Sequence, residues 1–60
     1  MPARFIIVRQ KEGHADRVVS TCNDYRQNEE WCDRLNALAG EGSNFFTADW
    51  AYAEQHDLAY

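Results

Sequence analysis

The chain has 60 residues, and its ten acidic and six basic side chains give a formal net charge of −4. Hydrophobic residues make up 45% of the sequence, which is too many for a disordered chain, and no apolar run reaches the roughly 18 residues of a membrane span. So short a chain predicts a single domain (residues 1–60) with little room for an enzyme pocket. We expect a cytoplasmic protein, in which Cys22 and Cys32 stay reduced.

Two apolar segments near the start of the chain predict a β-hairpin. "RFIIVR" (4–9) contains a continuous apolar run that is typical of a central strand. "RVVSTC" (17–22) follows a polar stretch in which Gly13 supplies the positive φ that tight turns often need. A turn centred near Gly13 predicts cross-strand pairs between Val8 and Val19 and between Ile6 and Thr21.

The next segment, "DYRQNEEWCDRLNALAG" (24–40), has the apolar period of an α-helix. Asp24 and Gln27 have the spacing of a capping box at its start. Gly40 or Gly42 is expected to end the helix, because glycine readily adopts the left-handed conformation there. The face expected to cover a sheet consists of Trp31, Leu35, Leu38 and Ala39, with Tyr25 or Asn28 one turn earlier.

The last segment, "ADWAYAEQHDLAY" (48–60), follows an expected loop, "EGSNFF" (41–46), and allows two interpretations. Its alanines favour a helix. Its alternation of large residues with small or polar ones, from Trp50 to Leu58, favours a strand. We favour the strand, because a two-stranded hairpin under one helix is marginal in water and the first strand needs a second neighbour.

These elements predict an α+β fold in the order ββαβ. It has a three-stranded antiparallel sheet of order 2-1-3, with one helix packed on one face. The expected core consists of Ile6 or Ile7, Val8, Val19, Trp31, Leu35 and Leu38.

The segments "RFIIVR", "RVVSTC", "DRLNALAG" and "AYAEQHDL" give an outline that resembles short proteins of phages and other mobile elements. In size and charge the chain is most similar to the small acidic inhibitors that phages carry against host defence, including anti-CRISPR proteins. The resemblance implies a phage or mobile-element protein that blocks a host defence complex. It assigns no role to any particular residue.

Catalytic and metal-binding motifs are not expected. Cys22 and Cys32 are separated by nine residues, which is not the spacing of structural zinc sites. His14 and His56 are each close to an aspartate, but no nucleophile is tied to either histidine by sequence. The sequence therefore predicts no enzyme activity, no cofactor and no metal.

The acidic side chains are concentrated in the second half of the chain. Residues 1–26 carry five basic and three acidic side chains, whereas residues 27–60 carry one basic and seven acidic ones. This charge disfavours direct binding of nucleic acid and favours a host protein or complex with a basic nucleic-acid-binding groove. The predicted partner-binding residues are Glu29, Glu30, Asp33, Asp49, Trp50, Tyr52, Glu54 and Asp57.

The alternative is a structural or dimerising module in which the acids only keep the chain in solution. An exposed third strand would then offer an edge for a homodimer.

Overall fold

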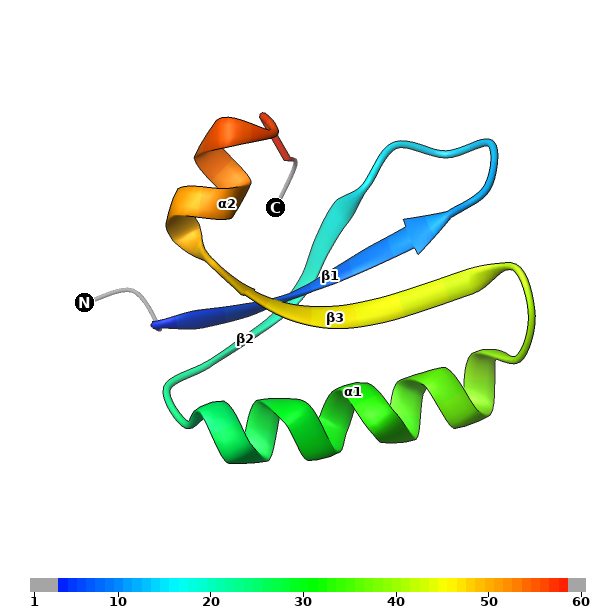
Figure 1. Ribbon diagram of the computed structural model, residues 1–60, viewed down its shortest axis with the longest axis horizontal. Coiled ribbons are helices and arrows are strands. Elements are labelled where there is room, and N and C mark those ends of the chain that lie inside the picture. Colours follow the sequence, from blue (N-terminus) through cyan, green and yellow to red (C-terminus); the bar gives the residue numbers. More distant parts are fainter. Residues whose placement is uncertain (1–3, 59–60) are drawn as a thin grey trace.

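The computed structural model describes residues 4–58 and contains one antiparallel sheet and two helices (Figure 1). The sheet has the order β2-β1-β3, which confirms the predicted α+β fold and its three-stranded antiparallel sheet. None of the helices in this described part is long and apolar enough to cross a membrane. The elements are β1 (Phe5–Lys11), β2 (Arg17–Cys22), α1 (Tyr25–Ala39), β3 (Ser43–Asp49) and α2 (Trp50–Gln55).

The β1–β2 hairpin turns where the sequence predicts. Gly13 has a φ of 82°, and the amide of His14 donates to the carbonyl of Lys11 at 3.0 Å. The predicted pair of Ile6 and Thr21 is present.

The other predicted pair, Val8 with Val19, is wrong. Ile7 pairs with Ser20, and Val8 then pairs with Val18, so Val19 is an extra residue in β2. Such a β-bulge changes which face of the sheet the following side chains occupy. As a result Val18 is buried, while Val19 is 41% exposed.

The third strand is present in the predicted position of the sheet, but it is formed by residues 43–49 and not by residues 48–60. Thr47 and the two phenylalanines before it are good strand residues. Asp49 ends the strand, because its Oδ1 accepts the amide of Tyr52 at 2.9 Å and begins a helix there. Only residues 40–42 separate α1 from β3, so the loop predicted at 41–46 is shorter than expected. The strand predicted at 48–60 is wrong, because residues 50–55 form the helix α2.

The two helices lie on opposite faces of the sheet (Figure 1). Side chains alternate along a strand, so Ile7 and its partner Thr47 share one face, and Ile6 and Val8 share the other. α1 bonds to the hydroxyl of Thr47, whereas Ala53 of α2 packs with Ile6 and Val8. The predicted single helix layer is thus accompanied by a second, smaller one.

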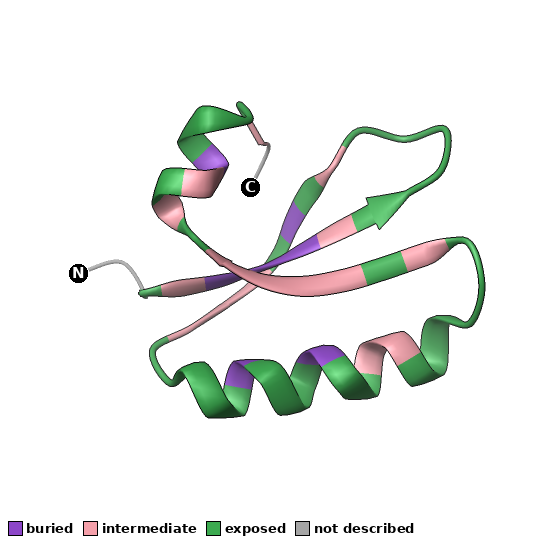
Figure 2. Cartoon of the chain, viewed as in Figure 1, coloured by how far each residue is buried: buried purple, intermediate pink, exposed green. Residues whose placement is uncertain are grey.

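The apolar core cluster lies on the α2 side of the sheet. Figure 2 shows the buried positions on both helices and on β1 and β2. The prediction that Val19, Trp31 and Leu38 belong to the core is wrong, because all of them are exposed. Val8 is fully buried as predicted, Ile6 and Ile7 are both fully buried where only one of them was expected, and Leu35 is half-buried. The core cluster consists of Ile6, Val8, Val18 and Ala53, with Phe46, Ala48, Trp50, Tyr52 and Leu58 packed against it.

The contact between α1 and the sheet is largely polar. Asn28 is only 1% exposed, and its Nδ2 donates to the carbonyl of Ile6 at 3.1 Å and to the hydroxyl of Thr47 at 3.4 Å. The Sγ of Cys32 lies 3.5 Å from the same hydroxyl. Asn28 and Cys32, one turn apart, therefore face the sheet, and Trp31 is turned to the side of the helix.

Candidate binding surfaces

The start of α1 is held by a small network that includes Cys22. The carboxylate of Asp24 accepts the amide of Gln27 at 3.2 Å, which confirms one half of the predicted capping box. The amide of Asp24 donates to the Sγ of Cys22 at 3.4 Å, and that thiol lies 3.7 Å from the Oε1 of Gln27. In a complete capping box the side chain of Gln27 would bond to the amide of Asp24. Here the thiol of Cys22 accepts that amide, and Gln27 contacts the thiol instead.

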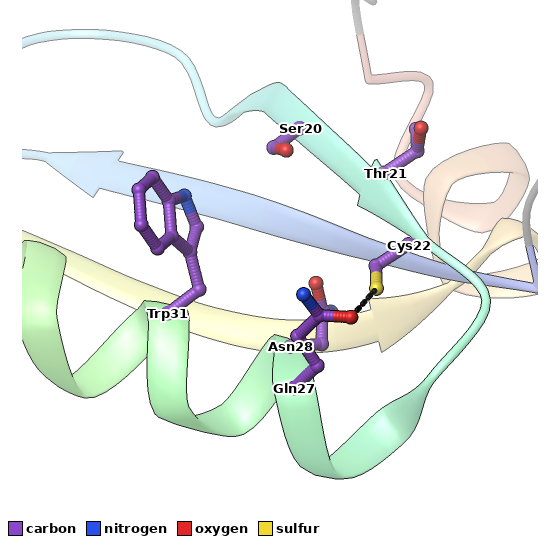
Figure 3. Close-up of a pocket in the computed structure, with 6 residues that line it drawn as sticks. All are labelled: Ser20, Thr21, Cys22, Gln27, Asn28 and Trp31. Carbon is purple, nitrogen blue, oxygen red and sulfur yellow. Dashed lines mark hydrogen bonds between the residues drawn. The ribbon is translucent and has the colours of Figure 1, made fainter.

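A groove of about 270 Å³ lies between β2 and α1 (Figure 3). It exists because α1 is anchored toward β3, through bonds from Asn28 to Thr47 and from Asn36 to Phe45. The β2 side of the same sheet face is left uncovered. The groove is lined by Ser20, Thr21, Cys22, Gln27, Asn28 and Trp31.

A large exposed apolar side chain, Trp31, lines this groove, and two others are exposed on the elements that form it. Trp31 is 47% exposed and Leu38 is 79% exposed on α1, and Val19 is exposed on β2. The guanidinium of Arg34 lies 5.7 Å from the centre of the Trp31 ring, so a positive charge lies next to this exposed tryptophan. Large exposed apolar side chains next to a groove are typical of protein–protein contacts.

The predicted acidic residues of α1 all reach solvent. Glu29, Glu30 and Asp33 are exposed. Glu29 accepts a hydrogen bond from the hydroxyl of Tyr25, which raises the pKa of that phenol. No carboxylate within residues 4–58 forms an ion pair with an arginine or lysine, although Arg26 and Arg34 lie on the same helix as these three acids.

The predicted acidic residues of the last segment lie elsewhere. Glu54 and Asp57 are exposed on and just after α2, on the opposite side of the sheet from α1. Asp49 is the N-cap of α2, so its carboxylate is engaged by the backbone. The structure therefore divides the predicted acidic surface between two sides of the molecule.

The two predicted aromatic anchors belong to the protein's own interior. Trp50 and Tyr52 are half-buried and pack against the core cluster. The Tyr52 ring meets Phe46 edge to face at 5.5 Å and lies 4.2 Å from the ring of His56. The aromatic side chain that is exposed beside the groove is Trp31, which the sequence assigned to the core.

The side chains of catalytic type are dispersed. No three His, Cys, Asp or Glu side chains between residues 4 and 58 are grouped as metal ligands would be. Cys22 is half-buried at the groove, and Cys32 is buried beneath α1, where burial raises the pKa of its thiol. A raised pKa opposes formation of the thiolate nucleophile at neutral pH.

The chain matches no protein-family model, no curated protein and no solved structure.

Proposed function

We propose that this chain is a small protein-binding inhibitor of the anti-CRISPR type, whose acidic helix α1 enters the basic nucleic-acid groove of a host defence complex. The observation that supports it is the exposure on α1 of Glu29, Glu30 and Asp33, none of which forms an ion pair within the described residues. Because these carboxylates have no cationic partner in the described molecule, a basic groove can pair with them without first breaking an internal ion pair.

The fold limits which acids act together. α1 is a helix of 15 residues supported along its length by the sheet, so its carboxylates are presented at defined positions. Glu54 and Asp57 lie on the other side of the sheet and point to a different surface. We therefore assign the partner-facing role to α1.

The test is inhibition of target-DNA binding by purified, guide-loaded CRISPR effector complexes, measured by fluorescence anisotropy. The wild-type chain should displace the DNA from its target complex. The variant Glu30→Lys/Asp33→Lys should inhibit at least tenfold less well, which is about 1.4 kcal/mol. The matched control, Glu54→Lys/Asp57→Lys, makes the same change of charge on α2 and should inhibit as the wild type does.

Inhibition should also weaken as salt rises, because screening acts on exposed charge pairs. If no complex loses its DNA in the presence of the wild-type chain, the inhibitor proposal fails. If both double variants inhibit equally well, the acids of α1 are only a solvated surface.

A second candidate function, a dimerising module, is favoured by the uncovered side of β2. The strand lies at an edge of the sheet, carries no proline and has one charged residue, Arg17. Such an edge is open to pairing with another strand. Pairing of β2 with β2 of a second copy would extend the sheet and shield Val19 and Trp31, which lie beside it.

Dimerisation is tested by sedimentation equilibrium over a range of concentrations. A monomer–dimer equilibrium that is abolished by Val19→Lys and kept in Glu54→Lys would support the module. A monomer at every concentration would exclude it.

A further inference from the structure

The bulged end of the β1–β2 hairpin carries two arginines side by side. Arg9 and Arg17 are cross-strand partners in the register of the sheet. Both line a hollow of about 370 Å³ whose other residues are Val18 and Val19. Like charges opposite each other destabilise a strand pair, so this arrangement costs the free protein some stability.

One donor of this pair has no partner inside the described molecule. The Nε of Arg9 is buried and has no hydrogen-bond partner. Among residues 4–58, no carboxylate forms an ion pair with Arg9 or Arg17. A buried donor without a partner destabilises the folded state, and more so when the group is charged. Two unfavourable features therefore meet at one place.

One kind of ligand would relieve both. An oxyanion accepts hydrogen bonds from the planar fork of a guanidinium, in which Nε takes part, and its negative charge offsets the repulsion between two neighbouring guanidiniums. We propose that Arg9 and Arg17 form a binding site for an oxyanion, either a phosphate or a carboxylate, at the bulge of β2.

The two arginines make this site positively charged, whereas the molecule as a whole carries a negative net charge. With a net charge of −4 the chain repels anions at long range, so general attraction cannot concentrate them. Binding at this position therefore depends on the two guanidiniums themselves. The inference is independent of the inhibitor proposal, which concerns the carboxylates of α1.

The experiment follows the side-chain Nε–Hε signals of the arginines by NMR while inorganic phosphate is added at constant ionic strength. The signals of Arg9 and Arg17 should shift and saturate, while those of Arg26 and Arg34 on α1 should not. A parallel titration with acetate separates the two ligand classes. Saturation by phosphate alone identifies a phosphate site, and saturation by acetate identifies a carboxylate site.

Variants at an exposed position keep the fold intact during this test. Arg17→Gln should raise the half-saturating concentration at least tenfold, and Arg17→Lys, which keeps the charge but not the fork, should raise it less. Arg26→Gln makes the same change of charge on exposed α1 and should bind as the wild type does. The proposal is overturned if neither anion saturates, if all arginine signals shift alike, or if Arg26→Gln weakens binding as much as Arg17→Gln.

Discussion

The side-chain amide of Asn36 pairs with the backbone of Phe45 as a neighbouring strand would. Its Nδ2 donates to the carbonyl of Phe45 at 2.9 Å, and its Oδ1 accepts the amide of Phe45 at 2.8 Å. β3 is the last strand of the sheet, so one of its edges has no neighbouring strand. Asn36 therefore occupies part of an edge that would otherwise offer unpaired donors and acceptors.

Replacing Asn36 by alanine should remove both hydrogen bonds and open the β3 edge. We expect Asn36→Ala to lower the free energy of unfolding by about 1–3 kcal/mol in urea denaturation, because two polar backbone groups lose their partners. Hydrogen exchange at the Phe45 amide should accelerate. Asn44→Ala, at an exposed position of the same strand, is the control and should change stability little. Unchanged exchange at Phe45 in Asn36→Ala would contradict this role.

The buried contact between Asn28 and Thr47 should be energetically coupled. Asn28→Ala leaves the carbonyl of Ile6 without this donor, and we expect a loss of roughly 1–3 kcal/mol. Thr47→Val keeps the shape but removes the hydroxyl that meets Asn28 and Cys32. A double-mutant cycle by urea denaturation should give a coupling of at least about 0.5 kcal/mol. Additive single effects would show that the hydroxyl is not a partner of Asn28 in solution.

The core on the α2 side is tested by a pair of identical substitutions on one short helix. Ala53 is 7% exposed among Ile6, Val8 and Val18, so Ala53→Arg would bury a charge and overfill the site. We expect a loss of about 3 kcal/mol or more, a large share of the stability of so small a domain. Ala51→Arg, on the exposed side of α2, should change the melting temperature little. Equal melting of the two variants would show that α2 does not cover the core.

The hairpin and first helix follow from local signals in the sequence, and α2 does not. Gly13 at the turn and Asp24 at the N-cap act within a few residues, so their effects can be predicted without knowledge of the fold. In the last segment strand and helix patterns coexist, and the decision depends on Asp49. Its carboxylate accepts the amide of Tyr52, and this contact ends β3 and begins α2.

The polar contact beneath α1 explains why the predicted core and the candidate site differ from the observed ones. The apolar periodicity of the helix predicts that large apolar side chains face the sheet, which favours Trp31 over Asn28. Asn28 and Asn36 face the sheet because backbone groups of Ile6 and Phe45 accept or donate hydrogen bonds there. These partners are 22 and 9 residues away in sequence, so the pattern within the helix carries no sign of them.

Stability should decline in alkaline solution because of Cys32. Burial raises the pKa of its thiol above the ordinary value of 9.0, so the folded chain holds this proton to higher pH than the unfolded chain does. The resulting stability is complete below that ordinary value and is lost as the pH rises through the raised pKa. Urea denaturation between about pH 8 and pH 10 should show the decline, and it should be smaller in Cys32→Ala.

Tyr25 contributes in the same direction at higher pH, since its bond to Glu29 raises the pKa of the phenol above 10.0. Tyr25→Phe therefore serves as the control that separates the two groups. A decline that is unchanged in Cys32→Ala and abolished in Tyr25→Phe would assign the effect to the phenol.

The position of the core has a consequence for the order in which the chain is synthesised. β1, β2 and α1 all precede residue 50, yet several side chains packed on the cluster around Ile6 and Val8 come from α2 and from Leu58. A growing chain thus has its hairpin and first helix before it has the cover for its most apolar face. Until residues 50–58 have been added, that face is available to chaperones and to other nascent chains.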